Sequence, residues 1–396
     1  MKISKLILAL SYGLTSAISH AQDAAGIDLG GFELIPSLNA SLQYDDNVAR
    51  SDSNESSSWV SVITPQFVLN SDYNGNLIKL GYRMVRGDYY SSAQDDFTDH
   101  IVFSSIDYDL NSRHRLTASV EFEDGHDDRG TRYSIGRGST LSGPDLFKQS
   151  QFQAGYSYGV DSATVKLDFN LDYRKLNYDL NTEDYLIRDR DNLLLGSTLF
   201  YSVSAATQLT FDARYRSINY KYTPGTSEVL DSKEPSLLIG AEWQASALTN
   251  GYVKLGVQRK DFESSQRNDF TGATWLAGIQ WNPNELNSVE VTTNGGTRET
   301  NGEGNFIKSK DISLKWRHDW LERLSTDVSL GYGKDDYEGE DNVRKDNTTQ
   351  LKLGLNYQFR RWLKFDLSYG YEDRDSNREA IAYDRRVYRL NAYITL

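Results

Sequence analysis

RVYRLNAYITL, the segment at residues 386–396, alternates between two faces almost without a break. One face carries Arg386, Tyr388, Leu390, Ala392, Ile394 and Leu396, and the other carries Val387, Arg389, Asn391, Tyr393 and Thr395. A period of two with one apolar face predicts a half-buried β-strand. A strand at a sheet edge exposes unpaired backbone groups unless another strand covers it. Because the pattern recurs along the chain, the sequence predicts an all-β, transmembrane antiparallel up-and-down barrel, closed by pairing this strand with the first.

The same alternation predicts about eighteen strands. They lie near 32–44, 57–70, 76–89, 100–110, 114–123, 147–160, 163–177, 190–202, 207–221, 235–245, 250–261, 270–281, 287–297, 305–316, 325–336, 347–359, 363–373 and 385–396. An even number of strands places both ends of the barrel on the periplasmic side. Short connections such as 161–162 alternate with long ones such as 124–146, which is the pattern of periplasmic turns and outward loops.

Length and composition favour one closed sheet over several soluble domains. No Pro-, Gly- or Ser-rich linker divides the 396 residues, so a single barrel is predicted for 22–396. The chain has 26 Tyr and 7 Trp but a mean hydropathy of -0.60, as expected when one strand face meets lipid and the other water. No apolar run of about twenty residues follows the amino terminus, which excludes helical spanning. The absence of Cys excludes disulfides and thiolate metal sites.

Residues 1–21 have the pattern of a signal peptide. Lys2 and Lys5 are followed by the apolar run Leu6–Leu10, and Ser19-His20-Ala21 offers small residues for cleavage. We expect the mature chain to begin near Gln22 and to reach the outer membrane of a Gram-negative bacterium, among its lipids and lipopolysaccharide. The formal charge of -13 disfavours binding to nucleic acid.

Charged residues on the strands share the face opposite the apolar side chains. Lys or Arg facing lipid at the membrane midplane costs roughly 2–4 kcal/mol, so these charges are predicted to line a water-filled lumen. The predicted pore-lining residues are Lys166, Asp168, Asp172, Arg174, Asp212, Arg214, Arg216, Lys254, Lys315, Lys352, Lys364 and Asp366. A soluble β-sandwich would need these charges outside. A lumen with both signs of charge and Tyr side chains suits sugars, although any hydrated barrel would have a similar lining.

The predicted first strand carries the most specific motif. It ends in Tyr44-Asp45-Asp46-Asn47, and Trp59 and Thr64-Pro65 follow in the second strand. This resembles outer-membrane β-barrel porins of the barrel-porin-2 type, which accompany exopolysaccharide and capsule synthesis clusters. The resemblance implies export of a polysaccharide to the cell surface, together with a periplasmic polysaccharide-export protein. From the residues alone, Asp45-Asp46-Asn47 could either begin a turn or order the pore mouth.

The longest predicted connection, 124–146, is the main candidate for a loop that folds into the channel or outward from it. Its Arg129, Arg132 and Arg137 would attract an anionic polymer in the channel, or pair with phosphates of the outer leaflet. His126 in the same segment is the one candidate for a catalytic histidine, and an enzyme is not expected. Solvated loop charge is the favoured reading of the acidic clusters 335–341 and 373–377, so no metal and no cofactor are predicted.

Two transport hypotheses remain open at this point. Export of polysaccharide is the leading one, and passive uptake of small solutes or oligosaccharides is the alternative, with a hydrolase or adhesion barrel more distant. The final strand also resembles the carboxyl-terminal signal read by barrel-insertion machinery, a second expected partner, although it ends in Leu396 rather than an aromatic residue.

Overall fold

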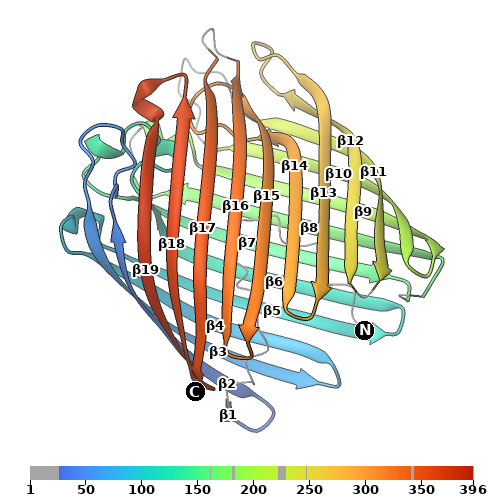
Figure 1. The fold of residues 1–396 in the computed structure, drawn as a ribbon. Helices are drawn as coiled ribbons and strands as arrows, with labels where there is room; N and C mark the ends of the chain where they lie inside the picture. The colour runs from blue at the N-terminus through green and yellow to red at the C-terminus, as the bar shows by residue number, and fades with distance from the viewer. Residues whose placement is uncertain are drawn as a thin grey trace.

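The computed structural model describes residues 26–160, 162–180, 183–221, 229–246, 248–339 and 343–395. Within these ranges eighteen long strands, β2 to β19, form one antiparallel sheet in which every strand pairs with its neighbours in sequence (Figure 1). Their bounds are β2 Glu33–Asp45, β3 Ser58–Tyr73, β4 Asn76–Tyr89, β5 Phe97–Asn111, β6 His114–Asp127, β7 Asp145–Tyr158, β8 Val165–Tyr178, β9 Arg190–Ser204, β10 Thr207–Tyr220, β11 Ser232–Ser246, β12 Thr249–Phe262, β13 Phe270–Asn284, β14 Asn287–Arg298, β15 Phe306–Leu321, β16 Leu324–Glu338, β17 Lys345–Arg360, β18 Leu363–Ser376 and β19 Tyr383–Thr395.

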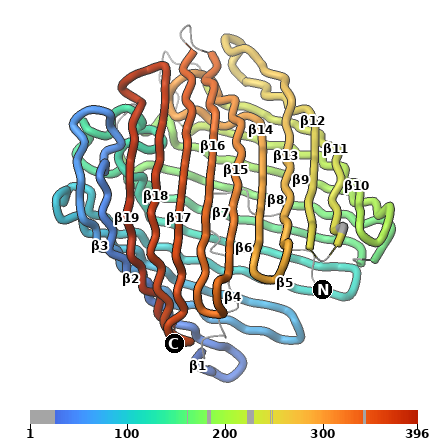
Figure 2. Tube along the Cα trace, in the orientation of Figure 1, coloured from blue at the N-terminus to red at the C-terminus, as the bar shows by residue number. Residues whose placement is uncertain are grey.

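The sheet closes on itself where the last strand meets the first. β19 pairs antiparallel with β2 in a register that runs from Val387 opposite Asp45 to Thr395 opposite Ser37 (Figure 2). Closure leaves no strand edge along this seam, so the backbone groups of both strands are paired. The predicted up-and-down barrel of eighteen strands, with closure between the two terminal strands, is confirmed. A short additional strand, β1 (Ile27–Asp28), pairs with the start of β2.

Side chains alternate between the outside and the inside of the barrel. On β10, Leu209, Phe211 and Tyr215 are exposed on the outer face, whereas Thr210 and Asp212 point inward and are buried. The same alternation of exposed apolar residues with inward polar ones follows from the period of two in a strand. Among the described residues, no helix is long and apolar enough to cross a membrane.

The two ends of the barrel differ in their connections. Eight connections are short, such as 74–75, 112–113 and 205–206, and they define the turn end, near which β1 and the carboxyl terminus also lie (Figure 1). The nine others define the loop end: 46–57, 90–96, 128–144, 179–189, 221–231, 263–269, 299–305, 339–344 and 377–382. Their described parts contain four 3-10 turns, at 93–95, 132–134, 138–140 and 379–381, and one short α-helix at 183–186.

One predicted boundary is wrong in an informative way. The connection expected at 124–146 is shorter, because β6 continues to Asp127 and β7 begins at Asp145. Gly125 and His126 therefore lie in a strand, although glycine and acidic neighbours suggested a loop. Asp124 and His126 lie on the same strand face as the exposed Phe122, so polar residues occupy both faces here, and backbone pairing with β7 continues as far as Asp127.

Candidate channel and its loop end

The barrel interior carries all twelve residues predicted to line the pore. Each lies on the face of its strand opposite the exposed apolar side chains, so the strand periodicity gave their direction. Their exposure varies: Asp212 and Lys254 are almost fully buried, whereas the side chain of Lys315 is 55% exposed. Eighteen strands are enough to leave an aqueous lumen inside the sheet.

Opposite charges pair along the interior wall. Lys254 Nζ lies 3.2 Å from an Asp212 carboxylate oxygen and 3.0 Å from Glu242. Arg214 also approaches Asp212 at 3.4 Å, and Arg216 lies 3.2 Å from Glu234. Because these charges largely compensate one another, this part of the wall is polar without a strong net field. Four other predicted residues also have polar partners: Lys166 lies 3.5 Å from Asp168, which is itself a predicted residue, Lys315 lies 3.8 Å from Glu290, and Asp172 and Asp366 accept hydrogen bonds from the amides of Gln153 and Asn391.

The Tyr44-Asp45-Asp46-Asn47 motif holds the β2–β19 seam at the loop end. Arg385 Nε lies 3.0 Å from both carboxylate oxygens of Asp45, which points inward and is 1% exposed. Asp46 accepts a 2.6 Å bond from the backbone N–H of Arg386. The fully buried Asn47 donates to the backbone oxygens of Ser51 and Asp384. Tyr44 faces outward, with its ring centroid 5.4 Å from that of Trp59. The motif therefore forms the turn after β2 and links β2 to β19 at the loop end, while a role in ordering the pore mouth stays a prediction.

The connection 128–144, named here the latch segment, is anchored by a buried arginine. Arg129 forms a bidentate ion pair with Asp95 in the 90–96 connection, with Nε–Oδ1 and Nη2–Oδ2 distances of 2.6 Å. Both side chains are at most 5% exposed. Arg129 also donates to the backbone oxygens of Gly138 and Leu141. Arg50, from the 46–57 connection, donates to Arg129 O and to Asp128. Arg129 is therefore occupied by the protein itself and is not available to a polymer.

The latch segment contacts two other connections at the loop end. On one side, Gly136 packs against Ile381 in the connection between β18 and β19, close enough that a Cβ on Gly136 would lie 3.1 Å from the Ile381 side chain. On the other side, the Tyr133 ring lies beneath the guanidinium of Arg188, in the connection between β8 and β9, at 4.4 Å. Following the strand order, these two connections lie nearly halfway around the ring from each other. The β8–β9 connection is next to the segment's own strands, so it is the contact with Ile381 that takes the segment over part of the opening.

Other connections at the loop end are held together by ion pairs and hydrogen bonds. Glu303, between β14 and β15, accepts ion pairs from Arg344 at 3.2 Å and from Arg378 at 2.8 Å. These two arginines come from the connections after β16 and β18. Glu299 bonds to Tyr220 and to the buried Lys260. Side chains from the strands and connections between β10 and β19 thus pair with one another at the loop end.

The three arginines predicted from the latch sequence have different surroundings. Arg129 is buried as described, Arg132 Nε lies 3.1 Å from Asp127 with half of its side chain exposed, and Arg137 donates to Tyr133 O at 3.2 Å. The two outer arginines thus stay closer to solvent than Arg129. Sequence reasoning missed Arg50, Asp95 and Arg188, because their partners come from connections distant in sequence and no local motif marks them.

His126 is held as a structural residue. Nδ1 lies 2.8 Å from Asp99 and Nε2 lies 3.2 Å from Asp128, while the ring stacks on Phe97 with centroids 3.8 Å apart. Both ring nitrogens are therefore engaged, and no Ser or Cys side chain is among the partners described for the ring. The described part of the chain contains no group of three His, Asp or Glu side chains arranged to hold a metal ion. The predicted acidic cluster 335–341 lies only in part within the described residues.

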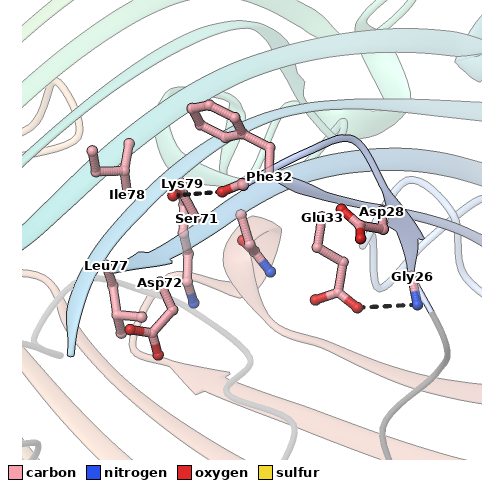
Figure 3. Close-up of a pocket in the computed structure, with 11 residues that line it drawn as sticks. Gly26, Asp28, Phe32, Glu33, Ser71, Asp72, Leu77, Ile78 and Lys79 are labelled. Carbon is pink, nitrogen blue, oxygen red and sulfur yellow. Dashed lines mark hydrogen bonds between the residues drawn. The ribbon is translucent and has the colours of Figure 1, made fainter. Parts of the chain in front are cut away.

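The opposite, turn end carries a small cavity of about 580 Å³ (Figure 3). The segment around β1 covers the ends of β3 and β4 there, and Gly26 donates a 3.1 Å bond to Glu33. Asp28, Asp72 and Lys79 supply charges to its wall. The cavity is open and lies at the rim rather than in the lumen, so it adds a surface feature at the turn end. The expected signal peptide, residues 1–21, lies outside the described residues.

Comparison with solved structures finds barrels of the same kind at low sequence identity. The FrpB iron transporter of Neisseria meningitidis, F5-1 variant in the apoprotein form, aligns with a TM-score of 0.52 at 10% identity, covering 95% of this chain and 83% of that one. OpdL of Pseudomonas aeruginosa aligns with a TM-score of 0.49 at 12% identity, covering 93% and 99% of the two chains. No curated protein matches the chain.

The family described as "Putative beta-barrel porin 2" matches residues 20–395, which is nearly the full length. The match agrees with the resemblance seen in the first strand and with the closed barrel. The family is one of porins, not of enzymes, and its fold belongs in the outer membrane. This chain is therefore a member of the barrel-porin-2 family of outer-membrane β-barrel porins.

Proposed function

We propose that this porin exports a polysaccharide through its lumen to the cell surface. The observation that carries the proposal is a wide barrel with a polar, charge-paired interior whose mouth is covered by a segment held mainly through side-chain contacts. A hydrated polymer needs a wide path, and a cell needs that path to be narrow when no polymer occupies it. The exopolysaccharide and capsule association implied by the first-strand motif supports the same choice of cargo.

The chemistry of the wall suits an extended sugar chain. Paired charges offer donors and acceptors that exchange hydrogen bonds with hydroxyl groups without trapping a single ion. Tyr252 and Tyr393 lie on inward faces of β12 and β19 and offer ring surfaces to the apolar faces of sugars. Export of this kind requires no bond-forming step by the barrel.

Orientation follows from the unequal ends. Short turns face the periplasm and long loops face outward in bacterial barrels of this class, so the latch segment would close the cell-surface side. The turn end would then meet a periplasmic polysaccharide-export protein, while the outer faces of the strands contact lipid and lipopolysaccharide. Insertion would depend on the barrel-insertion machinery, after cleavage near Gln22.

Deletion of the gene, with complementation by the wild-type chain, tests the proposal. Loss of surface polysaccharide together with its retention in the periplasm is the expected result. Normal surface polysaccharide with slowed uptake of small sugars would overturn export and favour the alternative, a passive uptake porin. Measuring polymer in the surface and periplasmic fractions of the same culture separates a transport defect from a loss of synthesis.

A further inference from the structure

Arg188 is a buried cation for which the described residues provide no hydrogen-bonding partner. It lies just before β9 and is 6% exposed. Its guanidinium lies between two tyrosines, 4.4 Å from the Tyr133 ring centroid and 4.8 Å from that of Tyr185. Nε and Nη1 are enclosed and make no hydrogen bond within the described structure. Stacking uses the faces of the guanidinium, so the N–H groups along its edge remain without acceptors.

Such an arrangement is costly unless an anion completes it. An unsatisfied buried donor costs roughly 1–3 kcal/mol, and more when it is charged. The Asp145 carboxylate lies in the same region, where it accepts a hydrogen bond from Tyr185 and leaves its Oδ2 unpartnered, but it forms no ion pair with Arg188 within the described structure. Nη2 of Arg188 faces Gly302: a Cβ placed on that glycine would meet only this nitrogen, at 3.7 Å. The missing side chain at Gly302 leaves space beside Nη2.

Two further arginines, Arg137 and Arg190, lie near Arg188. Burial, with a contribution from Arg137, lowers the pKa of the Arg188 guanidinium, while Tyr133, Tyr185 and Asp145 act in the opposite direction. Arg190 lies on the other side of Tyr133, donates to its hydroxyl, and has an Nε without an acceptor. Glu299 lies in the same region, but its carboxylate bonds to Tyr220 and Lys260. Arg188 and Arg190 thus lie on the same tyrosine ring, that of Tyr133, where the latch segment meets the connection before β9.

We propose that Arg188 binds the carboxylate of an acidic sugar unit as the polymer passes the latch segment. This inference rests on the export function proposed above and names its cargo class as a polysaccharide containing uronic acid. A guanidinium edge matches the planar carboxylate through two parallel hydrogen bonds. Tyr133 and Tyr185 hold the guanidinium plane in position, so little ordering is needed when the ligand arrives.

Current through single channels of the purified full-length protein provides the test. Trigalacturonate is added to planar bilayers containing wild-type protein, Arg188→Gln or the matched control Arg317→Gln, which removes an inward arginine already paired with Asp319 and Asp327. Wild type and the control should be blocked at similar concentrations, whereas Arg188→Gln should require about 10- to 100-fold more, the factor for loss of a charged hydrogen bond. Arg188→Lys, which keeps the charge but not the planar fork, should fall between them.

Three results would overturn the inference. These are unchanged block of Arg188→Gln, equal block of wild type by the neutral trisaccharide maltotriose, or block by inorganic phosphate in the absence of any effect of trigalacturonate. Retention of a compact, heat-modifiable band in gels establishes that each variant is folded. The outcome is independent of the deletion experiment, because block is measured on the protein alone. A strain that still exports normally after deletion would reject the export function without altering the block.

Discussion

Removing Arg129 should release the latch segment from the barrel mouth. Arg129→Ala leaves Asp95 buried without its cation and deprives the Gly138 and Leu141 oxygens of a donor. Loss of one member of a buried ion pair costs about 3–5 kcal/mol, because the remaining charge is uncompensated. Since each 1.4 kcal/mol is a factor of ten, the ratio of docked to displaced segment should fall at least about one hundredfold.

Two measurements on protein in lipid bilayers report this displacement. Single-channel conductance should rise as the mouth widens. Trypsin should cut faster at Arg132 and Arg137 in the released segment, because cleavage requires the local backbone to leave its folded conformation. Arg259→Ala is the matched control, because Arg259 also pairs with two aspartates but is 54% exposed, and exposed pairs contribute at most about 1 kcal/mol.

A double variant separates release of the latch from general damage. Asp95→Ala combined with Arg129→Ala removes both charges, so it should be less destabilised at the mouth than Arg129→Ala alone. Wild-type conductance together with wild-type resistance to trypsin in a folded Arg129→Ala barrel would refute the assignment of this ion pair as the anchor. An equal defect in the Arg259→Ala control would also refute it.

Three further outcomes follow from the seam, the lipid face and the latch. Asp45→Ala should lower the free energy of unfolding by about 3 kcal/mol by leaving its buried cation unpaired, whereas the more exposed Asp46→Ala should cost under about 1 kcal/mol; equal melting of the two in a gel-shift assay would contradict this. Leu237→Arg on the lipid face should cost roughly 2–4 kcal/mol in refolding into liposomes, and the inward Ser236→Arg much less, so equal yields would count against the assigned facing. Burial alone would raise the pKa of Asp128, but Arg50 and His126 lower it below the ordinary 3.8. The stability that the ionised Asp128 contributes is therefore complete above pH 3.8 and is lost only at still lower pH. Conductance should match at pH 7.5 and pH 5, and opening of the channel at pH 5 would show that this carboxylate does not act as described.

The strands and their facing could be predicted because a period of two is local information. Lys352 and its neighbours alternate strictly with leucines, and the structure places them inside as the pattern required. Near the loop end this signal weakens, since both faces become polar. That is why β6 was predicted to end too early, before Gly125 and His126.

The contacts between connections at the loop end could not be predicted from the sequence, for a different reason. Arg129 and Asp95 are 34 residues apart, and either could pair with many charged residues in a chain this rich in them. Arg188 follows a helix of a single turn, and its two tyrosine neighbours come from different connections. Such contacts depend on how the barrel ring brings the connections together, which periodicity cannot supply.

The seam between β2 and β19 also has a kinetic meaning. Every other strand pairing joins sequence neighbours, whereas this one joins residues about 340 positions apart, as in the bond from Arg385 to Asp45. Closing a free loop of that length would cost about 5 kcal/mol of chain entropy from the logarithmic law. Hairpins that form in sequence order would remove most of that cost, so this contact is the natural last step of assembly. Asp45, Asp46 and Asn47 would then form their contacts with β19 only after the other strands have paired.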